Sequence, residues 1–435
     1  MTIFLLLWYN WKEVGDNVKQ LNLTSTPYII KCKDYNTLTF DLIYPTTYDA
    51  KNMFDKELFK QIVMNSSFDY KTEQEFKKAK ITKLIIGLNC KTVRYHNNLY
   101  IIYSLTIPDP KKVKDFNIEE SFEFFYNTIY KPNIINDEFN NKQFEREKEY
   151  IKFGIQNSLK RIQNYGFQRF IKVADDIGDL KNNLNNNLDL IENTTAKSLY
   201  DYYKKVVINN TPICVVYGNI LEKEVNKLYD KYFNRNNTIT INEDYDCYMK
   251  LNETTNYVEE VSKFNQSVLY MCYKVKNMKE EDKIYLMLLS DILNDRSTNL
   301  VFKTLRIKNN LIYSYNLLSY SRYGMFFIES YIEKNNKEKT IEVINELMNE
   351  LKNEKLIKDC ISKIIEELEY NLIETKDSKY YEFDKFIDNL LDTRKSLETI
   401  YETYQNIDIN EFMQFLNRVK LDTVYFLRGE VDETK

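Results

Sequence analysis

The stretch "TPICVVYGNILEKEVNKLYDKYF" at residues 211–233 has the pattern of a β-strand, a glycine turn and a helix. Near the carboxyl end, "LDTVYFLRGEVDETK" at residues 421–435 repeats the strand and the glycine. Gly218 and Gly429 lie 211 residues apart, which is about half of the 435-residue chain. The two stretches therefore predict that the chain contains an internal repeat of about half its length.

Helices of similar pattern precede both strands, at residues 194–207 and 408–419. In the second helix, Asp408 and Glu411 have the spacing of a capping box, in which each side chain accepts a hydrogen bond from the other residue's backbone. The repeat thus includes a helix as well as the strand that follows it.

Two β-hairpins are also expected, at residues 91–108 and 311–333, because β-branched and aromatic runs flank turn residues in both. The single histidine, His96, falls at the tip of the first hairpin, where a solvated turn residue is favoured over a ligand or base. The second hairpin turns near Ser321 to Gly324. His96 is therefore not expected to take part in chemistry.

Helices follow both hairpins. Apolar residues recur at helical spacing over residues 118–129 and again over 344–351. A longer helix comes next in each half, at residues 137–162 and over 361–372. The order strand, helix, hairpin, helices, strand therefore occurs twice.

This order predicts an α+β fold with two homologous domains in tandem, each a mixed, mostly antiparallel sheet with helices packed on one face. We place the domains at residues 1–235 and 236–435, with the join in 234–246. The amino-terminal run "MTIFLLLWYNWK" has no basic flank and is too short to span a bilayer, so we expect a first strand there.

Composition excludes several functions. With 61 Lys and Arg against 65 Asp and Glu, the net charge of −4 gives no reason to expect nucleic acid or an anionic membrane as a partner. The 8 glycines never come close enough for a dinucleotide fingerprint or a P-loop. The 6 cysteines form no C-x-x-C and no close pairs, which favours buried free thiols in a reducing, cytoplasmic compartment.

A single histidine also rules out H-E-x-x-H and any His-rich catalytic zinc site. A Ser-His or Cys-His system would depend on His96 alone. Paired carboxylates remain possible as an acid and a base, but 65 acidic residues single out no pair.

Three segments carry a resemblance to a known family: "FEREKEYIKFGI" (144–155), "TTAKSLYDYYKKVVINNTPICVVYGNI" (194–220) and, above all, "STNLVFKTLRIKNNLIYSYN" (297–316). They resemble insulinase-type peptidases, the inverzincins that include pitrilysin and the mitochondrial processing peptidase. The resemblance covers nearly the whole chain, and the duplicated order of elements supports it independently.

Competent members of that family carry H-x-x-E-H on a helix, with two histidines as zinc ligands and the glutamate as base. The matching helix here is "DKELFKQIVMNSS" (55–67), which places Glu57, Lys60 and Gln61 where His, Glu and His would stand. The family's two downstream glutamates match Glu147 and Gly154. The resemblance thus implies a chain that has no catalytic and no metal-binding residues and is not itself a zinc peptidase.

Competent members also have an R-E-x-x-G-L-x-Y stretch in the second domain, whose arginine and tyrosine contact bound peptide. Here "RIKNNLIY" keeps Arg306, Leu311 and Tyr313, but has Ile307 and Asn310 in place of Glu and Gly. The resemblance implies substrate binding by Arg306 and Tyr313. A surface salt bridge for Arg306 and a core aromatic for Tyr313 are the other interpretations.

Some bacterial members work as pairs, in which a silent subunit faces a zinc-bearing sister. The resemblance therefore implies a non-catalytic, peptide-positioning subunit of a heterodimeric insulinase-like peptidase, with zinc in the homologous partner and peptide as the substrate. A homodimer is possible. The alternative function is a stand-alone peptide- or protein-binding scaffold with no peptidase partner, and a hydrolase with a Ser or Cys nucleophile is favoured by no residue spacing.

Overall fold

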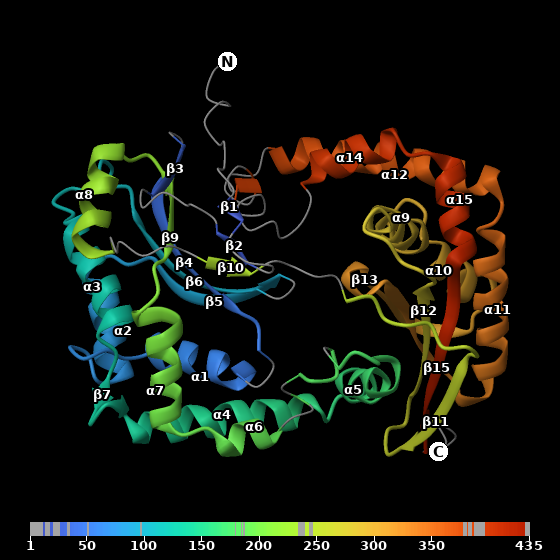
Figure 1. Ribbon diagram of the computed structural model, residues 1–435, viewed down its shortest axis with the longest axis horizontal. Coiled ribbons are helices and arrows are strands. Elements are labelled where there is room, and N and C mark those ends of the chain that lie inside the picture. Colours follow the sequence, from blue (N-terminus) through green and yellow to red (C-terminus); the bar gives the residue numbers. More distant parts are fainter. Residues whose placement is uncertain are drawn as a thin grey trace. The chain divides into compact units, whose positions relative to one another are not determined.

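The structure is a computed structural model that describes residues 12–13, 18–20, 27–32, 35–49, 52–95, 98–178, 180–183, 185, 188–233, 240–242, 247–376, 381, 385–386 and 396–430 (Figure 1). His96, the strand expected in the first eleven residues and most of the join expected at 234–246 lie outside the described residues. The chain forms two compact units. Unit 1 takes residues 1–155, 187–245 and 382–393, and unit 2 takes 156–186, 246–381 and 394–435. The predicted domains, 1–235 and 236–435, divide the sequence between its two repeats, and this division stays a prediction.

The sheet of unit 1 has five strands in the order β3-β9-β4-β6-β5. In this order the strands are Tyr28–Lys31, Ile213–Gly218, Thr37–Thr47, Asn98–Pro108 and Gly87–Tyr95. β3 and β9 run parallel, and every other neighbouring pair is antiparallel.

The sheet of unit 2 has the order β11-β15-β12-β14-β13. These strands are Asn256–Ser262, Val419–Gly429, Ser267–Val275, Met325–Ile332 and Ile312–Tyr320. β11 and β15 run parallel and the others antiparallel, so the two sheets share one topology. The predicted α+β class and both predicted hairpins, β5–β6 and β13–β14, are confirmed.

The helices follow the predicted order in both units. Unit 1 contains α1 (Met53–Val63), α2 (Glu73–Thr82), α3 (Ile118–Tyr130), α4 (Asn141–Ser158), α6 (Leu188–Asn193), α7 (Ala196–Tyr203), the π-helix η3 (Lys204–Ile208) and α8 (Glu222–Tyr232). Unit 2 contains α9 (Asp282–Asn294), α10 (Leu300–Phe302), the π-helix η4 (Lys303–Lys308), α11 (Lys337–Glu350), α12 (Glu354–Lys376), α14 (Leu397–Gln405) and α15 (Ile409–Arg418).

The smaller elements are short. They are the strands β1 (Lys12–Glu13), β2 (Val18–Gln20), β7 (Ile134–Ile135), β8 (Glu138–Phe139) and β10 (Thr240–Asn242), and the 3₁₀ turns η5 (Ser321–Tyr323) and η6 (Lys334–Asn336). No helix within the described ranges is both long enough and apolar enough to cross a membrane.

Gly218 and Gly429, the two repeated glycines, are required for the same structural reason. A Cβ atom at Gly218 would lie 2.7 Å from the carbonyl oxygen of Thr37, and one at Gly429 would lie 2.6 Å from that of Asn265. In both units the end of one strand therefore passes the backbone that enters the neighbouring central strand, β4 or β12. Only glycine allows this close approach. This requirement explains why both halves of the sequence have glycine at the end of this strand.

Asp408 caps α15, because its Oδ1 accepts from the backbone N–H groups of Asn410 and Glu411 at 2.7 and 3.2 Å. The Glu411 carboxylate does not complete the predicted capping box. It accepts instead from the Tyr285 hydroxyl of α9, at 2.6 Å.

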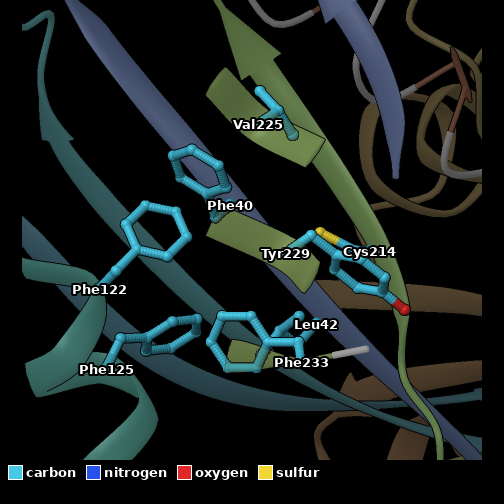
Figure 2. A pocket seen from close by; sticks show the side chains of 8 residues that line it. All are labelled: Phe40, Leu42, Phe122, Phe125, Cys214, Val225, Tyr229 and Phe233. Carbon is cyan, nitrogen blue, oxygen red and sulfur yellow. The ribbon is translucent and has the colours of Figure 1, made fainter. Parts of the chain in front are cut away.

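The core of unit 1 between the sheet and helices α3 and α8 is built mainly from aromatic rings (Figure 2). Phe40 of β4 packs edge-on against Phe122 of α3, with ring centroids 4.3 Å apart. The narrow space bounded by these rings does not admit a water molecule. It is lined by Phe40, Leu42, Phe122, Phe125, Cys214, Val225, Tyr229 and Phe233. It is packed interior, because a ligand-binding pocket is far larger.

The sheet of unit 2 is covered on both faces. One face packs against α9, α11, α12 and α15, as expected for helices on one side. The opposite face receives α5 (Ile162–Ala174), a helix that comes from the first half of the sequence and was not predicted. Phe170 of α5 stacks on Tyr270 of β12, with centroids 4.6 Å apart and ring planes 6° apart. Two of the three interior strands, β12 and β14, are consequently buried along their whole length.

Candidate functional site

Helix α1 carries the three residues that match the family's zinc motif. The Lys60 ammonium lies 2.7 Å from the Glu57 carboxylate, so these two side chains form an ion pair. The backbone carbonyl of Gln61 accepts from the Asn65 amide at 2.8 Å. A charged ammonium cannot ligate a metal ion, so this helix does not fit a zinc ion.

The downstream positions lie on α4. Glu147 is buried, and its Oε1 accepts from Nε and Nη2 of Arg146 at 2.9 and 2.5 Å. Gly154 has open space where a side chain would be. No group of three histidine, cysteine, aspartate or glutamate side chains able to hold a metal ion occurs in the part of the chain that the structure describes.

Arg306 lies in the π-helix η4, immediately before the edge strand β13. It is exposed, and its Nη1 donates to the carbonyl oxygen of Ile312 at 2.7 Å and to Oδ1 of Asn310 at 3.2 Å. Nε and Nη2 make no hydrogen bond to any residue that the structure describes. These two groups form the side of a guanidinium that binds a carboxylate in a bidentate manner. The salt-bridge interpretation of Arg306 is therefore not supported within the described residues.

Asn310 occupies the position at which the insulinase-type peptidases that this chain resembles have glycine. Its φ of 49° is in the left-handed region, which asparagine adopts more readily than other residues with a side chain. The chain therefore turns between η4 and β13 at a left-handed asparagine. The amide oxygen of Asn310 also orients Arg306, which a glycine could not do.

Tyr313 is 45% exposed, so it is not a core aromatic. The register of β13 against β14 shifts between Ile312 and Ser314, so Tyr313 lies at a β-bulge. The Tyr313 hydroxyl donates to Oε1 of Glu333 at 2.8 Å. The structure thus places both candidate residues at the start of β13, while their contact with peptide remains a prediction.

Asn299 supports this region and was missed by the sequence analysis. It adopts φ 42°, caps α10 through its side chain, and accepts from the Tyr315 hydroxyl of β13 at 2.6 Å. It therefore ties the segment that carries Arg306 to the strand that carries Tyr313. A left-handed asparagine next to a helix start has only a weak signal in sequence, because asparagine is also common in ordinary loops.

Comparison with known proteins confirms the resemblance. Residues 193–368 match the family described as "Peptidase M16 inactive domain". The fold is that of solved structures of M16 peptidases and of an M16 inactive domain.

A curated relative is the "Probable inactive metalloprotease YmfF" of Bacillus subtilis, 22% identical over 335 residues that cover 76% of this chain and 78% of that protein. Among solved structures, a conserved protein from Enterococcus faecalis V583 is similar, with a TM-score of 0.80, 17% identity, and 93% of this chain and 96% of that chain covered. A protease from Helicobacter pylori has a TM-score of 0.71 and 16% identity, with 95% and 100% covered.

Proposed function

We propose that this chain is the non-catalytic, peptide-positioning subunit of a heterodimeric insulinase-type zinc peptidase. The zinc ion and the catalytic base belong to a homologous partner subunit, and this chain binds no zinc. Arg306 and Tyr313 contact the substrate peptide. The observation that carries the proposal is the guanidinium of the exposed Arg306, which is held through Nη1, while Nε and Nη2 make no hydrogen bond to any described residue.

Such an arrangement contributes orientation to catalysis. A guanidinium fork can hold a peptide carbonyl or carboxylate with two charged hydrogen bonds. Holding the peptide in one pose removes part of the entropy cost of the reaction in the partner's active site. The resemblance implies that the peptide also adds as a strand to a sheet edge of the zinc subunit.

The kind of partner is suggested by the relatives, which include a protein named as a probable inactive metalloprotease and a protease of the same fold. A homodimer is the other assembly to test. We further propose a cytoplasmic location, because Cys90, Cys214, Cys272 and Cys360 are buried free thiols, as is usual in a reducing compartment. Burial raises the pKa of the Cys90 thiol to about 12, which makes it unreactive.

Affinity purification of the tagged chain from its native organism tests the proposal. We expect a second protein of similar size, encoded with an H-x-x-E-H motif, to co-purify in equal amount and to bring peptidase activity with it. Recovery of the chain with a different protein, or with no peptidase activity in the fraction, would favour the stand-alone binding scaffold.

A further inference from the structure

β13 is an edge strand of the unit 2 sheet, and it pairs only with β14 among the described strands. Its other edge therefore presents backbone N–H and C=O groups without a ladder partner. Most of its side chains are exposed as well: Tyr313, Ser314, Asn316, Leu318 and Ser319. An edge of nine residues is long enough to pair with an extended peptide.

The sequence of β13, "IYSYNLLSY", has no charged residue and no proline. Edge strands of soluble proteins are usually protected by such residues, which discourage pairing with other chains. The outer strands β3, β5 and β11 of the two five-stranded sheets follow this rule: β5 contains Lys91 and Arg94, β3 ends at Lys31, and β11 contains Glu259 and Glu260. Among the described edges of these sheets, β13 is the unprotected one.

One end of this edge carries positive charge. Nη1 of Arg306 donates to the carbonyl oxygen of Ile312, the first residue of β13, while Nε and Nη2 make no hydrogen bond within the described ranges. The nearby acid, Glu333, accepts from Tyr313. The start of the edge is therefore suited to a carboxylate and its remaining length to an uncharged backbone.

We propose that β13 is a docking edge for an extended, uncharged peptide segment that runs antiparallel to it and places its C-terminal carboxylate on Nε and Nη2 of Arg306. The antiparallel direction follows because Arg306 lies at the amino-terminal end of β13, so a peptide that ends there runs against the strand. The inference rests on the proposed function in identifying the occupant as a peptide. Hydrolysis of a peptide bond creates such a carboxylate, so the segment on the amino side of the cleaved bond has the chemistry that this edge recognises.

The test uses the full chain without a partner and measures fluorescence anisotropy of a labelled, uncharged heptapeptide of Thr, Val and Ser. One form has a free C-terminal carboxylate and the other a C-terminal amide. We expect the carboxylate form to bind and the amide form to bind about tenfold more weakly. In Arg306→Ala the two forms are expected to bind equally, because the charged contact is lost.

Edge substitutions test the strand itself. Leu318→Lys adds a charge to the exposed edge and is expected to weaken binding about tenfold. Ser319→Lys repeats this test at a smaller exposed side chain, in case Leu318→Lys disturbs folding as judged by the urea midpoint. The matched control is Asn89→Lys, an exposed position on the edge strand β5, which should leave binding unchanged.

Three results overturn the inference: no binding of the carboxylate peptide, unchanged binding in both β13 lysine variants, or an edge-to-edge dimer of the chain that peptide does not compete with. The proposed function fails separately. If peptide binds at β13 and no zinc subunit co-purifies, the docking edge stands without the peptidase pair. If a reconstituted pair contains either lysine variant of β13 and cleaves normally, the pair stands and the docking edge fails.

Discussion

At the scale of single residues, Arg306 and Asn310 act together. Asn310 provides the left-handed turn before β13, and its amide oxygen holds one nitrogen of the arginine. Among the residues that the structure describes, Nε and Nη2 of the guanidinium have no hydrogen-bond partner. The role assigned to Arg306 thus has a local structural cause and does not depend on the family resemblance alone.

Replacing Arg306 should affect peptide turnover but not assembly. In a reconstituted pair with the zinc subunit, Arg306→Ala is expected to lower kcat/KM by about one to two decades, because a hydrogen bond to a charged group is worth roughly 1.5 to 3 kcal/mol. Arg306→Lys should recover little, since a point charge cannot replace the planar fork. The measurement is steady-state cleavage of a quenched fluorescent peptide, with gel filtration to show that the pair is intact.

Lys308→Ala is the matched control, because Lys308 is an exposed cation of the same π-helix. It should leave turnover near the wild-type value. Wild-type turnover of Arg306→Ala would show that this arginine is a surface residue that does not contact the substrate. Dissociation of the pair would show that it is an interface residue.

At the scale of elements, helix α5 packs on the unit 2 sheet through Gly166. A Cβ atom there would lie 2.8 Å from the hydroxyl oxygen of Tyr270, which is fixed by a 2.7 Å hydrogen bond to the buried Glu329. The Tyr331 hydroxyl and the Asn316 amide also donate to this carboxylate. The close approach of the helix therefore requires glycine.

Two glycine substitutions in neighbouring helices should have opposite effects. Gly166→Ala is expected to destabilise the protein by about 1 to 3 kcal/mol, because the methyl group overlaps a hydroxyl that cannot move freely. Gly154→Ala on α4 has open space and should stabilise by about 0.5 to 1 kcal/mol through helix propensity. Urea unfolding of the two variants measures both, and equal stability would mean that α5 does not pack as described.

Helices α9 and α14 are joined by a half-buried carboxyl group. Burial raises the pKa of Asp291 to about 6, although the hydrogen bond from the Tyr404 hydroxyl, at 2.7 Å, lowers it, and the charge of Asp295 raises it further. Because the folded pKa exceeds the unfolded value, the folded state binds more protons between about pH 4 and 6. The contribution of this group to stability is thus present at low pH and lost as pH rises through 6.

Asp291→Asn should remove this dependence, because an amide keeps the acceptor for Tyr404 without titrating. The difference in Tm between wild type and variant should favour the wild type more at pH 5 than at pH 7. Thermal unfolding of both proteins across pH 4 to 8 measures this difference. A constant difference over this range would show that Asp291 does not titrate in the folded protein as described.

The sequence predicted the elements that rest on local pattern. Both hairpins and the repeated glycines were found, because periodicity and turn residues are local signals. The helix α5 and the supporting role of Asn299 were not, since each depends on contacts with strands about 100 or 16 residues away in the chain. The positions of Arg306 and Tyr313 came from the resemblance, and their exposure, turn and hydrogen bonds came from the structure.

At the scale of the whole molecule, the two units have sheets of the same strand order but different side chains at their candidate sites. Unit 1 has the Lys60–Glu57 ion pair on α1, and unit 2 has Arg306 and Tyr313 at the start of β13, where we propose that they contact peptide. The central claim is that catalysis belongs to a complex in which this chain supplies only the position of the peptide.

Zinc analysis of a reconstituted pair, combined with cleavage of a quenched fluorescent peptide, tests this claim most directly. After dialysis we expect about one zinc per pair, held by the partner, no stoichiometric zinc in this chain alone, and cleavage that appears only when both subunits are mixed. Tight binding of about one zinc by this chain alone, together with peptide cleavage in the absence of any partner, would contradict the account.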